Sequence, residues 1–91
     1  MRLVSVSTTS EAFVDEVQIV TDVAKEIESY LASHRGAADG IRGIIEWWLR
    51  DLPYVPNPEH VALALAALRW RGIVRCDLLA DGSELWSRAD G

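Results

Sequence analysis

The imidazole and thiol groups that often carry nucleophilic or metal chemistry are few in this chain: two histidines, His34 and His60, and one thiol, Cys76. A Cys–His catalytic pair needs an activated thiolate and a third group that orients the imidazole. Cys76 falls in an alternating segment, on the same face as Val74 and Leu78, so we expect a buried and inert thiol. The sequence contains no CxxC or HExxH motif and no glycine-rich phosphate loop after a strand. The pattern predicts no catalytic residue, no metal site and no cofactor.

Arginines offer a second kind of chemistry, which is binding to the phosphates of nucleic acid. The candidates are Arg42, Arg69, Arg71 and Arg75. However, residues 58–88 carry four bases and four acids, and the whole chain has a net charge of −5. A chain of this charge gains little from long-range attraction to nucleic acid. Nucleic-acid binding is therefore the alternative hypothesis and not the first one.

Length and composition predict one domain over residues 1–91, with 49% hydrophobic residues to form its core. The single cysteine rules out a disulfide within the chain and fits a reducing cytosol. No apolar run reaches the 18 residues that suggest a membrane span, and the amino-terminal residues do not resemble a secretory signal. We expect a soluble, cytoplasmic protein with no membrane partner and no evident small-molecule ligand.

The element that organises the rest is a helix over residues 58–71. Asn57 is a favourable N-cap, Pro58 suits the first helical turn, and Gly72 suits the position just after the last one. The apolar residues of this segment recur at helical spacing and predict one buried stripe. They are Val61, Ala64, Leu65 and Leu68.

After Gly72 the period changes to two, which predicts a two-stranded hairpin over residues 73–88. Asp81-Gly82 is the dipeptide favoured in two-residue type I′ turns. Such a turn sets Asp77 opposite Trp86.

These features together resemble the winged helix-turn-helix superfamily, the domain of many bacterial regulators of the MarR and GntR kind. The resemblance covers about a third of the chain directly, and the upstream helices fit it. It implies a mainly helical α+β fold of three helices followed by a hairpin wing. In DNA-reading members the third helix enters the major groove and the wing touches the backbone. The matching residues are Val61, Ala64-Leu65, Leu68, Gly72-Ile73-Val74-Arg75 and Asp81-Gly82.

Upstream, residues 1–10 alternate weakly and predict an edge strand beside the wing, or else a loose tail. Thr8 and Glu11 have the spacing of a capping box, so the first helix is expected to begin near Thr9 and to cover residues 11–34. An apolar stripe with spacings of four and three runs along this helix. It contains Phe13, Val17, Val20, Ala24, Ile27 and Leu31.

This first helix is longer than a small three-helix domain needs. Its amino-terminal half should therefore project, and Phe13, Val17 and Val20 are our candidates for self-association. The alternative is a bend at Thr21-Asp22 that makes two helices. The acids of the first helix either form a solvated face, or mimic phosphate or meet a basic partner; Asp15, Asp22 and Glu26 are the ones considered.

A second helix is predicted over residues 39–51, with Asp39 as its N-cap, followed by a proline-rich connector over residues 53–58. Trp47 and Leu49 should flank the core stripe of this helix. The stripe itself contains Ile41, Ile44, Ile45, Trp48 and Leu52.

The outward face of the 58–71 helix has no side chain suited to reading base edges. It carries Leu63, Ala67 and Trp70 instead, and an apolar face of this kind usually marks a protein contact. The sequence therefore predicts a non-enzymatic adaptor or assembly subunit that binds a protein partner or itself, with Trp47 as a second patch. A dimeric DNA-binding regulator is the alternative. A further possibility is that the amino-terminal strand or the first helix covers Leu63 and Trp70 within the chain.

Overall fold

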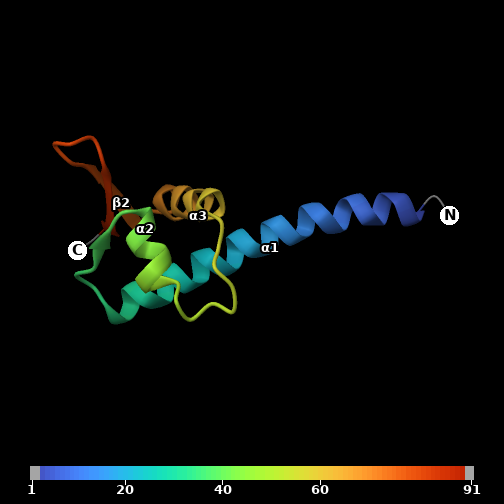
Figure 1. The fold of residues 1–91 in the computed structure, drawn as a ribbon, viewed down its shortest axis with the longest axis horizontal. Helices are drawn as coiled ribbons and strands as arrows, with labels where there is room; N and C mark the ends of the chain where they lie inside the picture. Colours follow the sequence, from blue (N-terminus) through green and yellow to red (C-terminus); the bar gives the residue numbers. More distant parts are fainter. Residues whose placement is uncertain (1–2, 90–91) are drawn as a thin grey trace.

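The computed structural model describes residues 3–89, and it describes side chains from residue 16 onward. The chain forms three helical units and a three-stranded antiparallel sheet, which is an α+β fold (Figure 1). In chain order the elements are α1 (Leu3–Ser33), β1 (Ala38–Asp39), α2 (Ile41–Gly43), the π-helical turn η1 (Ile44–Trp48), α3 (Pro58–Trp70), β2 (Val74–Leu78) and β3 (Glu84–Arg88).

Helix α1 starts much earlier than the sequence indicates. Residues 3–10 are helical, so the edge strand expected over residues 1–10 is wrong for this range, and the capping box at Thr8 does not begin a helix. The helix also continues through Thr21-Asp22 without a break, which contradicts the two-helix alternative. Weak alternation in a Ser/Thr-rich stretch is a poor strand signal when the apolar residues that follow keep helical spacing.

The third strand of the sheet comes from β1 and not from the amino terminus. Strand β3 lies in the middle, so the order is β1-β3-β2. Trp86 of β3 therefore has Asp39 of β1 on one side and Cys76 of β2 on the other.

The hairpin between β2 and β3 forms, but its predicted register is off by one residue. Asp77 pairs with Leu85, not with Trp86. The N–H of Leu79 donates to the carbonyl of Ser83 at 2.8 Å, and the N–H of Gly82 donates to the carbonyl of Leu79 at 2.9 Å. The loop thus has three residues instead of two. A type I′ turn requires positive φ at both central residues, and within residues 3–89 only glycines have it, Gly82 at 90° among them.

A capping interaction at each end fixes where helix α3 begins and ends. The side chain of Asn57 accepts a hydrogen bond from the backbone N–H of Glu59 at 2.8 Å. At the other end Gly72 has φ of 77°, and the N–H of Ile73 donates to the carbonyl of Leu68 at 2.9 Å. This is a Schellman cap, and it turns the chain directly into β2. The observed range, Pro58–Trp70, ends within one residue of the predicted one.

The second helix differs from the sequence prediction in two ways. Asp39 belongs to β1, and the N-cap is Gly40, which makes no side-chain capping bond. The turn that follows is π-helical, since the N–H of Leu49 donates to the carbonyl of Ile44 at 3.0 Å. A π-helical turn contains one residue more than an α-helical turn, so the residues after it point in different directions from those of a regular helix. Leu49 is for this reason buried in the core, although we expected it to flank the apolar stripe of the second helix.

The core lies where the carboxyl-terminal half of α1, η1, α3 and the sheet meet. Figure 1 shows the amino-terminal half of α1 extending away from this core. A helix of 31 residues is about 46 Å long, which exceeds the 26 Å and 22 Å of the molecule's two shorter dimensions. No helix in the described part of the chain is long and apolar enough to span a membrane. The buried apolar residues are Val23, Ile27, Leu31, Ile44, Trp48, Leu49, Val61, Ala64, Leu65, Leu68, Val74 and Trp86.

Candidate protein-binding surface

The outward face of α3 is apolar and open to solvent. Leu63 is 52% exposed and Trp70 is 91% exposed, and Ala67 between them is exposed as well. The side of α3 that packs into the core consists of the four residues that the periodicity predicts, and the opposite side faces solvent. The four buried residues are Val61, Ala64, Leu65 and Leu68. The possibility that another part of the chain covers this face is therefore wrong for Trp70, and Leu63 is covered only in part.

A groove runs between this face and α1. Val17, Val20 and Thr21 from α1 line it together with Leu63 from α3, with Glu16 at its edge, and its volume is about 450 Å³. The structure thus brings together residues that the sequence pattern predicts to lie on two separate surfaces, one for self-association and one for protein binding. The side chain of Phe13, the third residue proposed for self-association, lies outside the described part.

The charges around this surface differ between its two ends. At the amino-terminal end of α3, Glu59 is exposed, and an oxygen of Glu16 lies 3.4 Å from Nε2 of His60. At the carboxyl-terminal end, Arg69 is exposed but lies near Cys76 of β2. The carboxylates of Glu16 and Glu59 therefore lie at one end of the apolar face, whereas the guanidinium of Arg69 lies on the side of α3 that faces the sheet.

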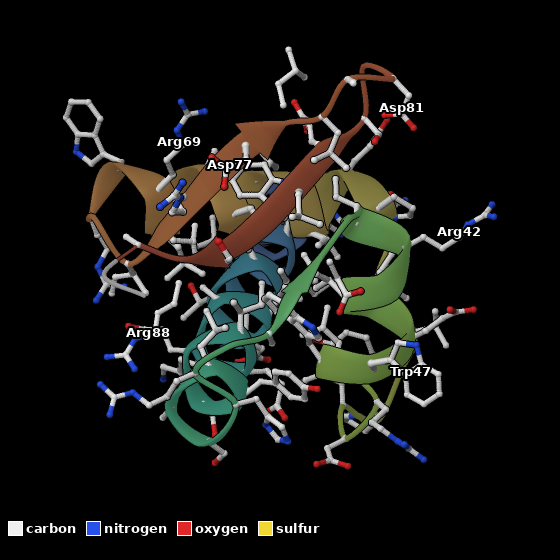
Figure 2. The ribbon with its side chains drawn as sticks, turned by 90° about the vertical axis from the view of Figure 1, so that its left-hand side faces the viewer. Arg42, Trp47, Arg69, Asp77, Asp81 and Arg88 are labelled. Atoms are coloured by element: carbon white, nitrogen blue, oxygen red, sulfur yellow. The ribbon has the colours of Figure 1, made fainter. Side chains whose placement is uncertain are left out.

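The four arginines proposed for nucleic-acid binding do not gather into one patch. Arg71 lies 3.4 Å from a carboxylate oxygen of Glu28, and Arg75 donates two hydrogen bonds to Asp77. This hydrogen bonding to Asp77 is the main cause of the raised pKa of Arg75. Figure 2 shows Arg42 and Arg69 at opposite edges of the molecule.

Trp47 forms a separate exposed patch. It is 54% exposed, and the guanidinium carbon of Arg50 lies 5.7 Å from the centre of its ring. Figure 2 places Trp47 and Arg69 at opposite sides of the view.

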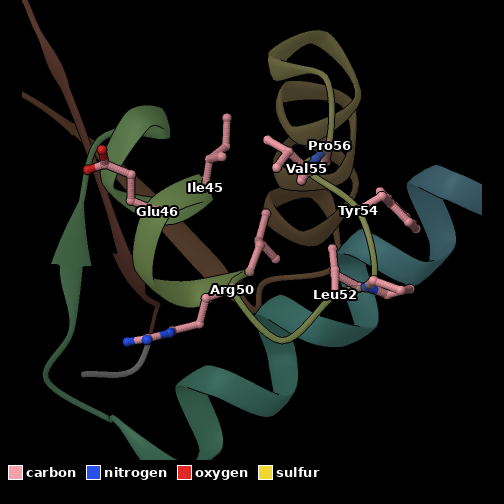
Figure 3. A pocket seen from close by; sticks show the side chains of 9 residues that line it. Ile45, Glu46, Arg50, Leu52, Tyr54, Val55 and Pro56 are labelled. Atoms are coloured by element: carbon pink, nitrogen blue, oxygen red, sulfur yellow. The ribbon is translucent and has the colours of Figure 1, made fainter.

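A second groove, of about 440 Å³, opens between η1 and the proline-rich connector (Figure 3). Its apolar lining includes Ile45, Leu52 and Val55.

The residues considered for catalysis have separate neighbours. His34 stacks on Tyr30 with ring centres 4.0 Å apart, and His60 lies beside Glu16. Burial raises the pKa of the Cys76 thiol, and the carboxylate of Glu84 raises it further, so the thiol is held protonated. Among the described residues, no three side chains of the metal-binding types gather into a possible ion site.

One specific contact was missed at the sequence level. The indole N–H of the buried Trp48 donates to the carboxylate of Asp39 at 2.9 Å. The two residues are nine positions apart, and the pattern that identifies Trp48 as a core residue contains no signal for a polar partner.

The fold and the surface define the class only as an α+β domain with an exposed apolar face on its third helix. No protein-family profile, no curated protein and no solved structure gives a significant match to the chain.

Proposed function

We propose that this protein is a non-enzymatic winged-helix module that binds another protein through the outward face of α3 and the adjoining groove. The winged-helix assignment is supported by three helical units followed by a hairpin. The glycine-capped passage from α3 into β2 supports it further.

The observation that carries the proposal is the exposure of two large apolar side chains on the same stripe of α3, about two helical turns apart. Leu63 is 52% exposed and Trp70 is 91% exposed. Burying such side chains contributes roughly 1.5–3 kcal/mol for each one fully removed from water. A protein partner provides that burial, whereas the backbone of nucleic acid does not. Tryptophan is also among the residues most enriched at the energetic centres of protein interfaces.

A site-specific cross-link tests the proposal. A photoreactive phenylalanine analogue replaces Leu63 in one variant and Val55 in a control variant, since Val55 is 83% exposed but lies on the connector. Irradiation in the native cells should give an adduct of defined mass from position 63 and none from position 55. The captured protein, once purified, should bind the wild type in calorimetry and should bind Leu63→Glu at least tenfold more weakly. Absence of any adduct at position 63 in a folded variant would contradict the proposal.

The alternative function, a DNA-binding regulator, is favoured by one observation: Arg42 and Arg69 are exposed. Fluorescence anisotropy with labelled duplex at about 50 mM and about 200 mM salt separates the two functions, because phosphate contacts weaken steeply over this range. The adaptor proposal expects no saturable binding at either concentration. Tight binding that falls by orders of magnitude with salt would favour the regulator.

A further inference from the structure

We infer that strand β2 pairs with β2 of a second copy of this chain, which joins the two sheets into one continuous antiparallel sheet. The pairing is centred on Cys76, so that Arg75 of each copy lies opposite Asp77 of the other. It goes beyond the proposed function, because it uses the edge of the sheet and not the outward face of α3.

Strand β2 forms a long and open edge. Strand β3 lies in the middle of the sheet, so β1 and β2 are its edges within the described residues, and β1 has two residues whereas β2 has five. Natural proteins often blunt such an edge with prolines, bulges or charged side chains. Strand β2 contains no proline, pairs with β3 without a bulge, and carries two charges of opposite sign. An edge of this kind can accept a further strand.

The hydrogen bonds to β3 fix which backbone groups of β2 face outward. The N–H of Leu79 donates to the carbonyl of Ser83, and the N–H of Ala89 donates to the carbonyl of Ile73. Because hydrogen-bonded pairs alternate with non-bonded pairs in an antiparallel ladder, the odd-numbered residues of β2 bond to β3. The N–H and C=O groups of its even-numbered residues therefore point to the open edge, and within residues 3–89 no turn or loop hydrogen bond reaches them. The even-numbered residues are Val74, Cys76 and Leu78.

The outward groups and the charges together select one register. Hydrogen bonds between the copies need an even-numbered residue opposite another even-numbered residue. When Cys76 lies opposite Cys76 of the other copy, Val74 lies opposite Leu78, and the outward N–H and C=O groups of both strands are paired. Between them, Arg75 lies opposite Asp77 of the other copy in a non-hydrogen-bonded pair, where side chains are closest. A slip of two residues in either direction would instead set Arg75 opposite Arg75, or Asp77 opposite Asp77.

The side chains of β2 fit a second copy of the same strand. Arg75 bonds to Asp77 of its own chain at 2.9 and 3.2 Å, so two such pairs side by side form an alternating network of four charges. Leu78, which is 74% exposed, gains an apolar neighbour in Val74 of the other copy. Arg69 of α3 approaches β2 from the core side of the sheet, where α3 packs with Val74, so it takes no part in this network. An unrelated strand would need the same order of charges to match β2.

Analytical ultracentrifugation of the full chain tests the inference. A contact of five residues on each side is smaller than the about 1,200 Å² of a stable interface, so dimers should form between about 10 μM and about 1 mM. The mass should rise from 10.1 kDa toward twice that value over this range. Leu78→Pro removes one outward N–H and no bond to β3, so it should abolish dimerisation. Leu79→Ala, the matched control at the next exposed leucine, should dimerise like the wild type, and circular dichroism checks that both variants are folded.

Amide hydrogen exchange followed by NMR gives a readout that needs no variant. The amides of Cys76 and Leu78 should be protected only at high protein concentration. Those of Arg75 and Asp77, which bond to β3, should be protected at every concentration. If Leu78→Pro fails to fold, this difference decides the question alone.

A charge reversal separates pairing between copies from pairing within one chain. The double variant Arg75→Asp/Asp77→Arg keeps opposite charges within each chain and should form its own dimer. Paired with the wild type it would set like charges opposite each other, so native mass spectrometry with isotope-labelled wild type should find mixed dimers several-fold below their statistical share. A wild type that stays monomeric at every concentration overturns the inference. So does free mixing of the two chains, a dimer that folded Leu78→Pro leaves intact, or a dimer whose Cys76 and Leu78 amides stay unprotected.

Discussion

Trp48 donates its indole N–H to Oδ2 of Asp39 at 2.9 Å, and this hydrogen bond joins the helical turn η1 to the two-residue strand β1. Asp39→Ala leaves the donor of a buried tryptophan without a partner, which costs about 1–3 kcal/mol. Urea denaturation should show this loss, and Asp39→Asn, which keeps an acceptor oxygen, should lose less. Equal stability of the wild type and Asp39→Ala would show that the bond contributes nothing net.

Gly43 lies against the same carboxylate. A Cβ atom added there would lie 2.7 Å from Oδ1 of Asp39, closer than real contacts allow. Gly43→Ala should therefore destabilise the fold by about 1–3 kcal/mol in spite of the better helix propensity of alanine. Gly36→Ala is the control, because nothing lies within 4 Å of its Cβ position and its φ is not positive. It should be neutral, or stabilising by up to about 1 kcal/mol. If both variants unfold at the same urea concentration, the crowding at Gly43 is relieved without cost.

Two leucines two positions apart on α3 should respond very differently to truncation. Leu65 is fully buried, so Leu65→Ala should cost about 2–5 kcal/mol of unfolding free energy. Leu63 is 52% exposed, and Leu63→Ala should change the stability of the monomer by less than about 1 kcal/mol. Denaturation at low micromolar concentration measures both. A large loss for Leu63→Ala under these conditions would place that side chain in the core and remove it from the binding surface.

The hairpin loop contains a carboxyl group with a shifted pKa. Ser83 Oγ donates to Oδ1 of Asp81 at 2.6 Å, and the backbone N–H of Ser83 donates to the same oxygen at 3.0 Å. The first bond and then the second hold the pKa of Asp81 below its ordinary value. Stabilisation from the ionised group is present above the unfolded-state pKa and is lost as the pH falls through the lower, folded-state pKa. An NMR carboxyl titration of Ser83→Ala should show the pKa of Asp81 rising toward the ordinary value. An unchanged midpoint would contradict the assignment.

Cys76 should react slowly with alkylating reagents. Burial is the main reason that its pKa is raised, so the thiolate fraction near neutral pH is smaller than in a free cysteine. Iodoacetamide should modify the folded chain several-fold more slowly than a cysteine peptide at the same pH. Unfolding in concentrated urea should abolish the difference. A reaction as fast as that of the peptide would mean that the thiol is accessible and activated.

The parts of the fold that the sequence predicts are those decided by local chemistry. Asn57, Pro58 and Gly72 mark the ends of α3, and the spacing of its apolar residues identifies the side that packs inward. The sequence does not predict the features for which two local conformations have similar energies, such as a two-residue or a three-residue hairpin loop, and an α-helical or a π-helical turn. The hairpin loop takes three residues because Asp81 bonds to Ser83 and only Gly82 takes positive φ. The π-helical turn around Ile44 changes which side of the second helix is buried, and single-residue insertions of this kind leave no periodic signal.

For the candidate site, too, the sequence predicts which residues share a helix face, but not how the helices pack together. Helical spacing was enough to place Leu63 and Trp70 on an outward face, and enough to place Val17 and Val20 on one stripe of α1. It could not show that these two surfaces meet at a groove, because the angle and offset at which α3 packs on α1 depend on the whole core. Nor could composition show that Arg71 and Arg75 are engaged by carboxylates, since Glu28 lies far from Arg71 in the sequence.

Because the four tryptophans differ in burial, their intrinsic fluorescence can report on the binding surface. Trp48 and Trp86 are 1% and 7% exposed, whereas Trp47 and Trp70 stand largely in water. An indole in water emits at longer wavelength than one in an apolar interior, and soluble quenchers reach it first. The native emission should therefore be a composite, with a red component that acrylamide removes and a blue component that it does not. Covering the face that carries Trp70 should move part of the red component into the blue, so that occupancy of the surface can be followed without any label.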